Sequence, residues 1–378
     1  MKVETIITPN NEIRYLLIDE YGNPVEPVMK FLKFKDHAGK SRNSLRAYCY
    51  HLKSFFDYLI HKEKLYTDVI LDDIPGYMRW LQNPFDNGKI IPINRIKPLR
   101  MPATINTYVA TVVNFYNYLY KSNSYLGNVR KDTVYEATRT SIPYKGFLYH
   151  IHRGMKLKKS IFLLKESKKH QKVLDIQMVE NLLKACNNPR DRFLILLLWE
   201  TGFRVGECLS LWLEDIEIES RKIEINDRTN TENGSEIKNV YSLRKIDVSA
   251  NLINEFLNYI SLIHTDEVNT NYVFVKLLGK RKGFPMEYDT VNALFRRLRK
   301  ETSIFVTPHL FRHTHFDMLR RNGWGFEQIR LRGGWSNVQT PMQLYSHPTD
   351  EELREAWKMT ENLFKLRGNK NEPTNQFY

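Results

Sequence analysis

The sequence predicts a mostly α-helical protein with one small β-sheet, divided between two domains. Apolar residues recur at helical spacing in both halves of the chain, β-rich runs occur only in the second half, and a lysine-rich stretch separates the two halves. The length of 378 residues also suits two domains rather than one.

The first part of the chain is expected to form a short arm followed by a helical domain. In the arm, residues 1–27, Gly22-Asn23-Pro24 is a turn signal and the alternation over Ile13–Ile18 indicates a small hairpin strand. Residues 28–155 form the helical domain. Its main evidence is two apolar and aromatic stripes at helical spacing, over Ser44–Lys62 and Thr104–Lys121.

Residues 156–172 carry seven lysines and one acid, Glu166, which indicates a linker between the two domains. Two interpretations stay open for this stretch. It is either a solvated charged segment or a basic strap that lies against a phosphate backbone.

Residues 173–366 are expected to form the second domain, with a flexible tail over residues 367–378. Asp175 is a candidate N-cap and Gly202 a candidate helix end. Two β-rich runs, Lys222–Asn226 and Val240–Val248, predict a hairpin with a long polar tip. The helices expected after it cover Asn251–His264, Tyr288–Glu301, His309–Arg321, Phe326–Leu331 and Asp350–Leu366.

The composition limits which binding partners and which cellular compartment are expected. A net charge of +14 favours a polyanionic partner, although charge alone also fits a basic protein without one. Three separated cysteines predict no disulfide framework, the first ten residues do not read as a secretory signal, and no apolar run is long enough for a membrane span. We therefore expect a cytoplasmic protein with no membrane contact.

The densest chemical signal lies between Thr307 and Thr314. Thr307 and Pro308 suit the N-cap and first position of a helix, which places His309 and Arg312 three residues apart on its first turns. A helix N-terminus attracts anions and an arginine grips phosphate with two parallel donors. This turn is a candidate phosphate-binding device, and the alternative is a capped surface helix.

A second arginine, Arg204, lies between a buried helix and the next one. Glu207, three residues later, is placed to hold it. The alternative interpretation is a local ion pair that contributes little.

These residues fall in three motifs that resemble those of the tyrosine recombinase (phage integrase) family. TGFRVGECLSL from Thr201 resembles its first arginine box, and HLFRHT from His309 resembles its His-x-x-Arg box. GGWSNVQTPMQLYSH from Gly333 is similar to its nucleophile box. The resemblance covers roughly residues 173–366. It extends more weakly to Pro27–Lys121, which is similar to the family's helical core-binding domain, and this implies that residues 28–155 form such a domain, SAM-like in fold.

The resemblance implies a role for each matching residue. Tyr345 is the expected nucleophile, which forms a 3′-phosphotyrosyl link without ATP. Arg204 and Arg312 are expected to hold the non-bridging oxygens, with Glu207 as supporting residue. His309 is expected to donate a hydrogen bond or to accept the tyrosine proton. No cofactor and no metal is expected, and the other histidines, His313, His315 and His347, are read as local hydrogen-bonding residues.

Two positions in the implied site need comment. A lysine in the hairpin is expected to protonate the leaving 5′-oxygen; Lys238 is the best candidate and Lys245 the nearest alternative. Trp335 stands where many members of the family carry a second histidine. Its indole donates one hydrogen bond and cannot shuttle a proton.

Double-stranded DNA is the expected partner, bound by a homotetramer on synapsed duplexes, with accessory recombination proteins as further candidates. The DNA contacts outside the site are expected at Lys280, Arg281, Lys282, Arg296 and Arg297, for which a solvated helix face is the alternative. The predicted function is integration or transposition of a mobile element. A type IB topoisomerase and a non-catalytic DNA-binding protein are the alternatives, and a set comprising Arg204, Lys238, His309, Arg312 and Tyr345 argues against the second of these.

Overall fold

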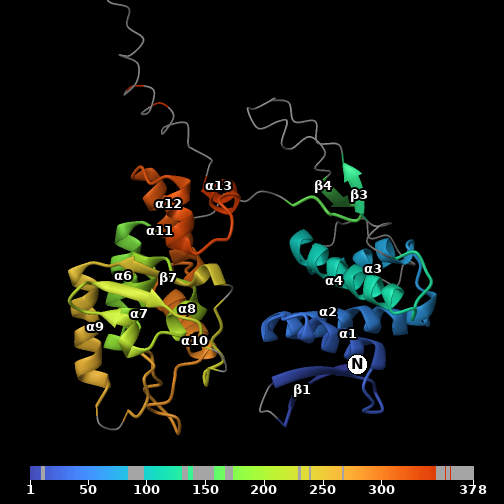
Figure 1. The fold of residues 1–378 in the computed structure, drawn as a ribbon, viewed down its shortest axis with the longest axis horizontal. Helices are drawn as coiled ribbons and strands as arrows, with labels where there is room; N and C mark the ends of the chain where they lie inside the picture. Colours follow the sequence, from blue (N-terminus) through green and yellow to red (C-terminus); the bar gives the residue numbers. More distant parts are fainter. Residues whose placement is uncertain are drawn as a thin grey trace, which may run out of the picture. The chain divides into compact units, whose positions relative to one another are not determined.

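The computed structural model describes residues 1–9, 13–83, 98–129, 135–138, 157–166, 173–228, 231–237, 240–265 and 268–345, with the isolated positions 354 and 358. Within them the chain forms two compact units, residues 1–169 (unit 1) and residues 170–378 (unit 2). Helices dominate both units, as the sequence predicts (Figure 1). Among the described residues, no helix combines the length and apolarity that crossing a bilayer needs.

Unit 1 is a helical bundle with a hairpin on one side. The strand expected at Ile13–Ile18 is present as β2 and pairs antiparallel with β1, Lys2–Ile7. Rather than projecting, the hairpin packs on α2 through Leu17, which is 1% exposed. The other elements of the unit are α1 (Glu26–His37), α2 (Arg42–His61), α3 (Asp73–Gln82), α4 (Pro102–Lys121) and the strand pair β3 (Tyr135–Thr138) and β4 (Leu157–Ser160).

Aromatic rings fill the core of unit 1. Phe55 meets Tyr77 edge-on at 5.0 Å between ring centroids, and Phe31 meets Phe115 in the same way at 5.6 Å. Edge-to-face contacts of this kind are favourable beyond the area they bury. The two stripes predicted from the sequence are the buried faces of α2 and α4.

Unit 2 is built around α7, Pro189–Thr201, which is buried along most of its length and packs against both α9 and α11. Asn188 caps its start and Gly202 ends it at φ +61°. A side chain at Gly202 would come within 2.7 Å of the His315 ring, so the position requires glycine for space as well as conformation. Around α7 lie α6 (Ile176–Lys184), α8 (Val205–Leu209), α9 (Ala250–Ile263), α10 (Tyr288–Thr302), α11 (Pro308–Arg321), α12 (Phe326–Gly333) and α13 (Gln339–Tyr345).

The sheet of unit 2 differs in part from the prediction. Strands β6 (Lys222–Ile225) and β7 (Arg244–Asp247) pair antiparallel as expected, but β5 (Ile216–Glu217) adds a third strand at the free edge of β6. Val240–Ser242 forms a 3-10 turn, so the second strand begins four residues later than predicted. The predicted strand start was wrong because exposed Val240 and Tyr241 read as β-rich although neither faces the core.

Of the helices expected after the hairpin, those before residue 345 are confirmed within one or two residues at each end. The helix expected over Asp350–Leu366 and the tail after it lie outside the described residues apart from positions 354 and 358. Helices α11, α12 and α13 lie together at the orange and red end of unit 2 in Figure 1, and they carry most of the candidate site.

Candidate active site

Arg204 lies at the junction between α7 and α8. It is the N-cap residue of α8, and its backbone N–H donates to the Glu207 carboxylate at 2.9 Å. Its guanidinium donates to the other oxygen of the same carboxylate at 2.6 Å. Glu207, three residues after Arg204 in the sequence, therefore stabilises both the start of the helix and the position of the arginine side chain.

Glu207 is fully buried, and its carboxylate also accepts hydrogen bonds from a second arginine. Arg244, at the start of β7, donates to its carboxylate at 2.9 and 3.3 Å and to the carbonyls of Ser242 and Arg332 at 2.6 Å each. Burial alone would raise the pKa of Glu207, but the charges of Arg244, Arg312 and Arg204 outweigh it and lower the pKa to about 2. The carboxylate is thus ionised at all physiological pH values.

The side chain of Arg312, which extends from α11, lies close to Arg204. Thr307 caps this helix through the backbone N–H of Leu310, with Pro308 at its first position, as predicted. The Arg312 guanidinium is buried and donates to the carbonyl of Gly202 at 2.8 Å and to that of Gly333 at 2.6 Å. Arg204 donates to the Gly333 carbonyl too, at 3.4 Å, so one acceptor joins the two guanidiniums.

The cluster around Glu207 is short of negative charge. Three guanidiniums, those of Arg204, Arg244 and Arg312, gather about a single carboxylate. Burial, reinforced by the charge of Arg204, lowers the pKa of Arg312 to about 9. An anion placed between Arg204 and Arg312 would supply the missing charge, so the arrangement suits a phosphate.

Trp335 packs on the face of Arg312. The guanidinium carbon lies 4.4 Å from the indole ring centroid, and Phe316 lies on it too, at 4.9 Å. Such stacking fixes the plane of the guanidinium and favours its charged form. The geometry therefore supports a packing role for Trp335.

Tyr345 ends α13 beside this stack and is 5% exposed. Its ring lies among Phe316, Ile329 and Trp335, and its hydroxyl is 3.1 Å from Nδ1 of His313. Burial raises the pKa of Tyr345, while the nearby charge of Arg312 lowers it by a smaller amount. The phenol is protonated in this environment and requires a proton acceptor before it can act as a nucleophile.

The two histidines of this helix have different surroundings. His309 is exposed on the first turn of α11, and its ring stands edge-on to His313 at 4.3 Å between centroids. His313 is buried, and burial together with the charges of His309 and Arg312 lowers its pKa to about 4. His313 is therefore neutral near pH 7.

The lysine expected in the hairpin, Lys238, lies outside the described residues. The segment just before it, residues 231–237, is fixed to the body of unit 2: Asn233 donates to the carbonyls of Leu209 and Met286 at 2.9 and 3.0 Å. The alternative, Lys245, forms an ion pair with Glu217 on the exposed side of the sheet. This pairing disfavours Lys245 as a proton donor to DNA.

The expected DNA contacts divide into two kinds. Lys280, Arg281, Lys282 and Arg296 are exposed. Arg297 is half-buried, and its guanidinium donates to the carbonyl of Ala185 and to the carboxylates of Asp191 and Glu301. Its contacts fit a residue that holds α10 in place better than one that meets DNA.

Sequence reasoning missed Arg244 and gave His313 only a generic role. Strand alternation was the available signal for Arg244, because it shares the inward face of β7 with Ile246. No pattern singles out His313, since only the fold brings α13 against α11.

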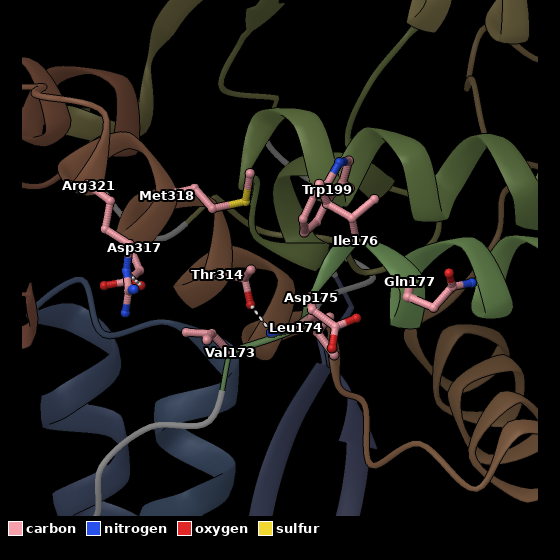
Figure 2. A pocket seen from close by; sticks show the side chains of 10 residues that line it. All are labelled: Val173, Leu174, Asp175, Ile176, Gln177, Trp199, Thr314, Asp317, Met318 and Arg321. Atoms are coloured by element: carbon pink, nitrogen blue, oxygen red, sulfur yellow. Dashed lines mark hydrogen bonds and ion pairs between the residues drawn. The ribbon is translucent and has the colours of Figure 1, made fainter. Parts of the chain in front are cut away.

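A separate open pocket of about 490 Å³ lies on another face of α11. Figure 2 shows Thr314, whose hydroxyl accepts from the Leu174 N–H at 3.0 Å, among the residues that line it. The rest of the lining is Val173, Asp175, Ile176, Gln177, Trp199, Asp317, Met318 and Arg321. None of the residues singled out for catalysis lines it.

Comparison with known proteins agrees with this geometry. The model of the phage integrase family matches residues 172–352. Transposase A from transposon Tn554 of Staphylococcus aureus is 34% identical over 355 residues, which cover 94% of this chain and 96% of that protein. Tyrosine recombinase XerA of Saccharolobus solfataricus is 26% identical, over 61% of this chain and 72% of that protein.

Solved structures show the same fold. The Tn1549 transposon integrase in complex with a circular intermediate DNA matches with a TM-score of 0.60 at 16% identity, over 88% of this chain and 98% of that one. The relatives and structures named here are transposases, integrases and recombinases, and nothing among them favours a topoisomerase. The chain belongs to the phage integrase family of tyrosine recombinases, the enzymes that cut and rejoin DNA in site-specific recombination.

Proposed function

We propose that this recombinase cleaves duplex DNA with Tyr345 and moves a mobile element by integration or transposition. The observation that carries the proposal is the joining of Arg204 and Arg312 at the Gly333 carbonyl, with Tyr345 in the same aromatic cluster as the Arg312 stack. The likeness to a transposase over 94% of the chain supports the mobile-element role.

In the proposed reaction the scissile phosphate binds between the two guanidiniums. The Tyr345 oxygen attacks phosphorus, a phosphorus–oxygen bond forms, and the bond to the 5′-oxygen breaks. Lys238 gives its proton to that leaving oxygen, and the 3′-phosphotyrosyl link retains the energy for rejoining. Arg204 and Arg312 stabilise the charge that develops on the non-bridging oxygens, and His309, exposed on the first turn of α11, donates a hydrogen bond to the phosphate.

Double-stranded DNA is the proposed partner, bound by four copies of the chain on two synapsed duplexes, in the cytoplasm where such DNA lies. Unit 1 and the exposed residues Lys280, Arg281, Lys282 and Arg296 would contact the backbone. Accessory recombination proteins are further partners for an element-encoded enzyme of this class.

The direct test is Tyr345→Phe on a nicked suicide substrate that carries a cleavage site. The variant should bind DNA as the wild type does and form no covalent complex, because the attacking oxygen is absent. A covalent complex in that variant would assign the nucleophile to another residue.

Lys238 is tested separately with a substrate whose 5′-bridging oxygen is sulfur. A thiolate leaves without a proton, so the sulfur substrate should restore cleavage by Lys238→Ala. Failure of this restoration would assign the proton to another donor.

A further inference from the structure

The hydroxyl of Tyr345 has a specific partner that the motif-based assignment does not include. It lies 3.1 Å from Nδ1 of His313, and both side chains are buried, at 5% and 6% exposed. A hydrogen bond inside such a cluster does not compete with bulk water, and when Nδ1 is the acceptor it fixes the direction of the phenol O–H. The motif-based expectation offered His309 either as a hydrogen-bond donor or as the acceptor of the tyrosine proton.

We propose that His313 is a catalytic residue, which accepts the proton of Tyr345 during cleavage and returns it during rejoining. This inference rests on the proposed role of Tyr345 as nucleophile. It adds a base to a site in which the position of a second histidine is occupied by Trp335, whose indole has no acceptor atom.

The residues around Tyr345 favour His313 as the acceptor of its hydroxyl proton. The ring of Tyr345 packs with Phe316, Ile329 and Trp335, none of which can take up a proton. The charge of Asp317, also on α11, acts on Tyr345, but its carboxylate is paired with Arg320 and Arg321. His313 is neutral near pH 7, so one of its ring nitrogens carries a free lone pair.

The tautomer follows from the direction of transfer. When Nδ1 accepts from the phenol, the ring proton resides on Nε2, and this atom is buried with no hydrogen-bond partner among the described residues. Burial disfavours the charged form of this ring, and the negative charge of a bound phosphate would act in the opposite direction by stabilising the imidazolium.

Arg312 and His313 are consecutive residues of α11, so the phosphate clamp and the base share one rigid support. The cap by Thr307 and the stacking of Arg312 on Trp335 hold this turn. A phosphate gripped by Arg312 is thus presented to a tyrosine whose proton is already directed at the next residue.

The proton and electron balance of the step is complete without a cofactor. The O–H electron pair of Tyr345 forms the new bond to phosphorus, its proton moves to Nδ1 of His313, and the 5′-oxygen leaves with a proton from Lys238. In rejoining, the 5′-hydroxyl gives its proton to Lys238 and attacks phosphorus, the phosphotyrosyl bond breaks, and His313 protonates the departing phenolate.

The experiment measures single-turnover formation of the covalent complex by His313→Gln and His313→Ala. Both should slow cleavage by about 10²-fold, the lower end for loss of a general base, with DNA affinity unchanged. The rate of the variants should rise with pH, because solvent base must then remove the proton. Glutamine keeps a polar group of similar size, so one variant remains informative if alanine weakens the fold.

A fluorinated tyrosine at position 345 separates a base from a structural residue. Its phenol ionises at lower pH, so it should restore most of the rate in His313→Gln. His315→Gln is the matched control: His315 is also buried on α11, but it bonds to the Trp199 carbonyl. Slowing in that variant should be insensitive to the acidity of the phenol.

Unchanged or faster cleavage in His313→Gln would overturn the proposal. His313 would then only hold the Tyr345 side chain in its buried position and take no part in the proton transfer. A slow variant that responds neither to pH nor to the fluorinated tyrosine would overturn it as well. A covalent complex in Tyr345→Phe would instead contradict the proposed nucleophile, so the two failures are distinguishable.

Discussion

The two units carry almost the same number of basic residues but use them differently. Unit 1 has 28 Lys and Arg against 15 Asp and Glu, a net charge of +13. Unit 2 has 29 against 28, a net charge of +1. The basic excess that suggested a nucleic-acid partner therefore belongs to unit 1.

In unit 2 several arginines are at least partly buried and are matched by acids. Glu207 holds Arg204 and Arg244, Asp215 holds Arg228, and Asp191 holds Arg190 and Arg297. In the described part of unit 1 the buried residues are almost all apolar or aromatic. The comparison separates a unit whose net positive charge suits a polyanionic partner from a unit in which a few charges are fixed in a defined geometry.

The largest effect is expected when an acid that pairs with arginines of unit 2 is removed, and it should appear as a loss of stability. Glu207→Gln leaves the guanidiniums of Arg204, Arg244 and Arg312 without the buried carboxylate between them, and it should lower the free energy of unfolding by about 3–5 kcal/mol. Urea denaturation of the wild type and the variant at pH 7 measures the loss. A loss below 1 kcal/mol would mean that the network contributes little.

The same pair of proteins gives a pH test with a definite sign. The pKa of Glu207 is lowered on folding from an ordinary 4.5 to about 2. Its stabilisation is therefore complete above pH 4.5 and is lost as the pH falls towards 2. The gap between wild type and Glu207→Gln should shrink between pH 6 and pH 3; a constant gap would contradict the assignment.

Arg312 should matter for chemistry more than for attraction to DNA. Arg312→Ala is expected to slow single-turnover cleavage by about 10²–10³-fold, the effect of losing one donor to the transition state. The salt dependence of DNA binding should change little, because one buried contact is removed out of many. A normal cleavage rate, or a loss confined to binding, would argue against the phosphate clamp.

Two neighbouring arginines on α10, Arg296 and Arg297, are expected to differ in their effects on stability and on DNA binding. Arg297→Ala should lower stability by about 1–2 kcal/mol, because its charged hydrogen bonds to Asp191 and Glu301 are lost. Arg296→Ala should weaken DNA binding and leave stability within about 0.5 kcal/mol. Thermal melting and binding assays on both variants check the pair, and the reverse outcome would exchange their roles.

The smallest effect is expected from single surface charges of unit 1. Arg46 is exposed on α2, and Arg46→Ala should reduce the slope of log affinity against log salt concentration by about 0.9, as for one phosphate contact. Lys30→Ala is the control, because Lys30 pairs with Glu26 at 2.7 Å. Equal slopes for the two variants would remove Arg46 from the proposed contacts.

Much of the fold was predictable because local signals and packing agree. Asp175, Thr307 and Gly202 mark helix ends in the sequence, and each does so in the structure through its own hydrogen bond or backbone angle. Three motifs likewise predicted that Arg204, Arg312 and Tyr345 belong to one site; in the structure Arg204 and Arg312 share the Gly333 carbonyl, and Tyr345 packs beside Trp335. The start of β7 was misplaced because β-propensity does not distinguish an exposed 3-10 turn from a strand.

The parts of the site that sequence could not provide depend on contacts between distant segments. Arg244 meets Glu207 across 37 residues, and His313 meets Tyr345 across 32. Neither separation corresponds to a helix or strand period, so no pattern relates the partners. The structure adds these two side chains to the arginines and the tyrosine that the motifs supplied.

The measurement that tests the central claim most directly is identification of the residue joined to DNA. The covalent complex on a suicide substrate is digested with protease and nuclease, and the modified peptide is sequenced by mass spectrometry. The account predicts a nucleotide on Tyr345 alone, attached through a 3′-phosphate. An adduct on another tyrosine, such as the exposed Tyr241 close to Gly334, would contradict it.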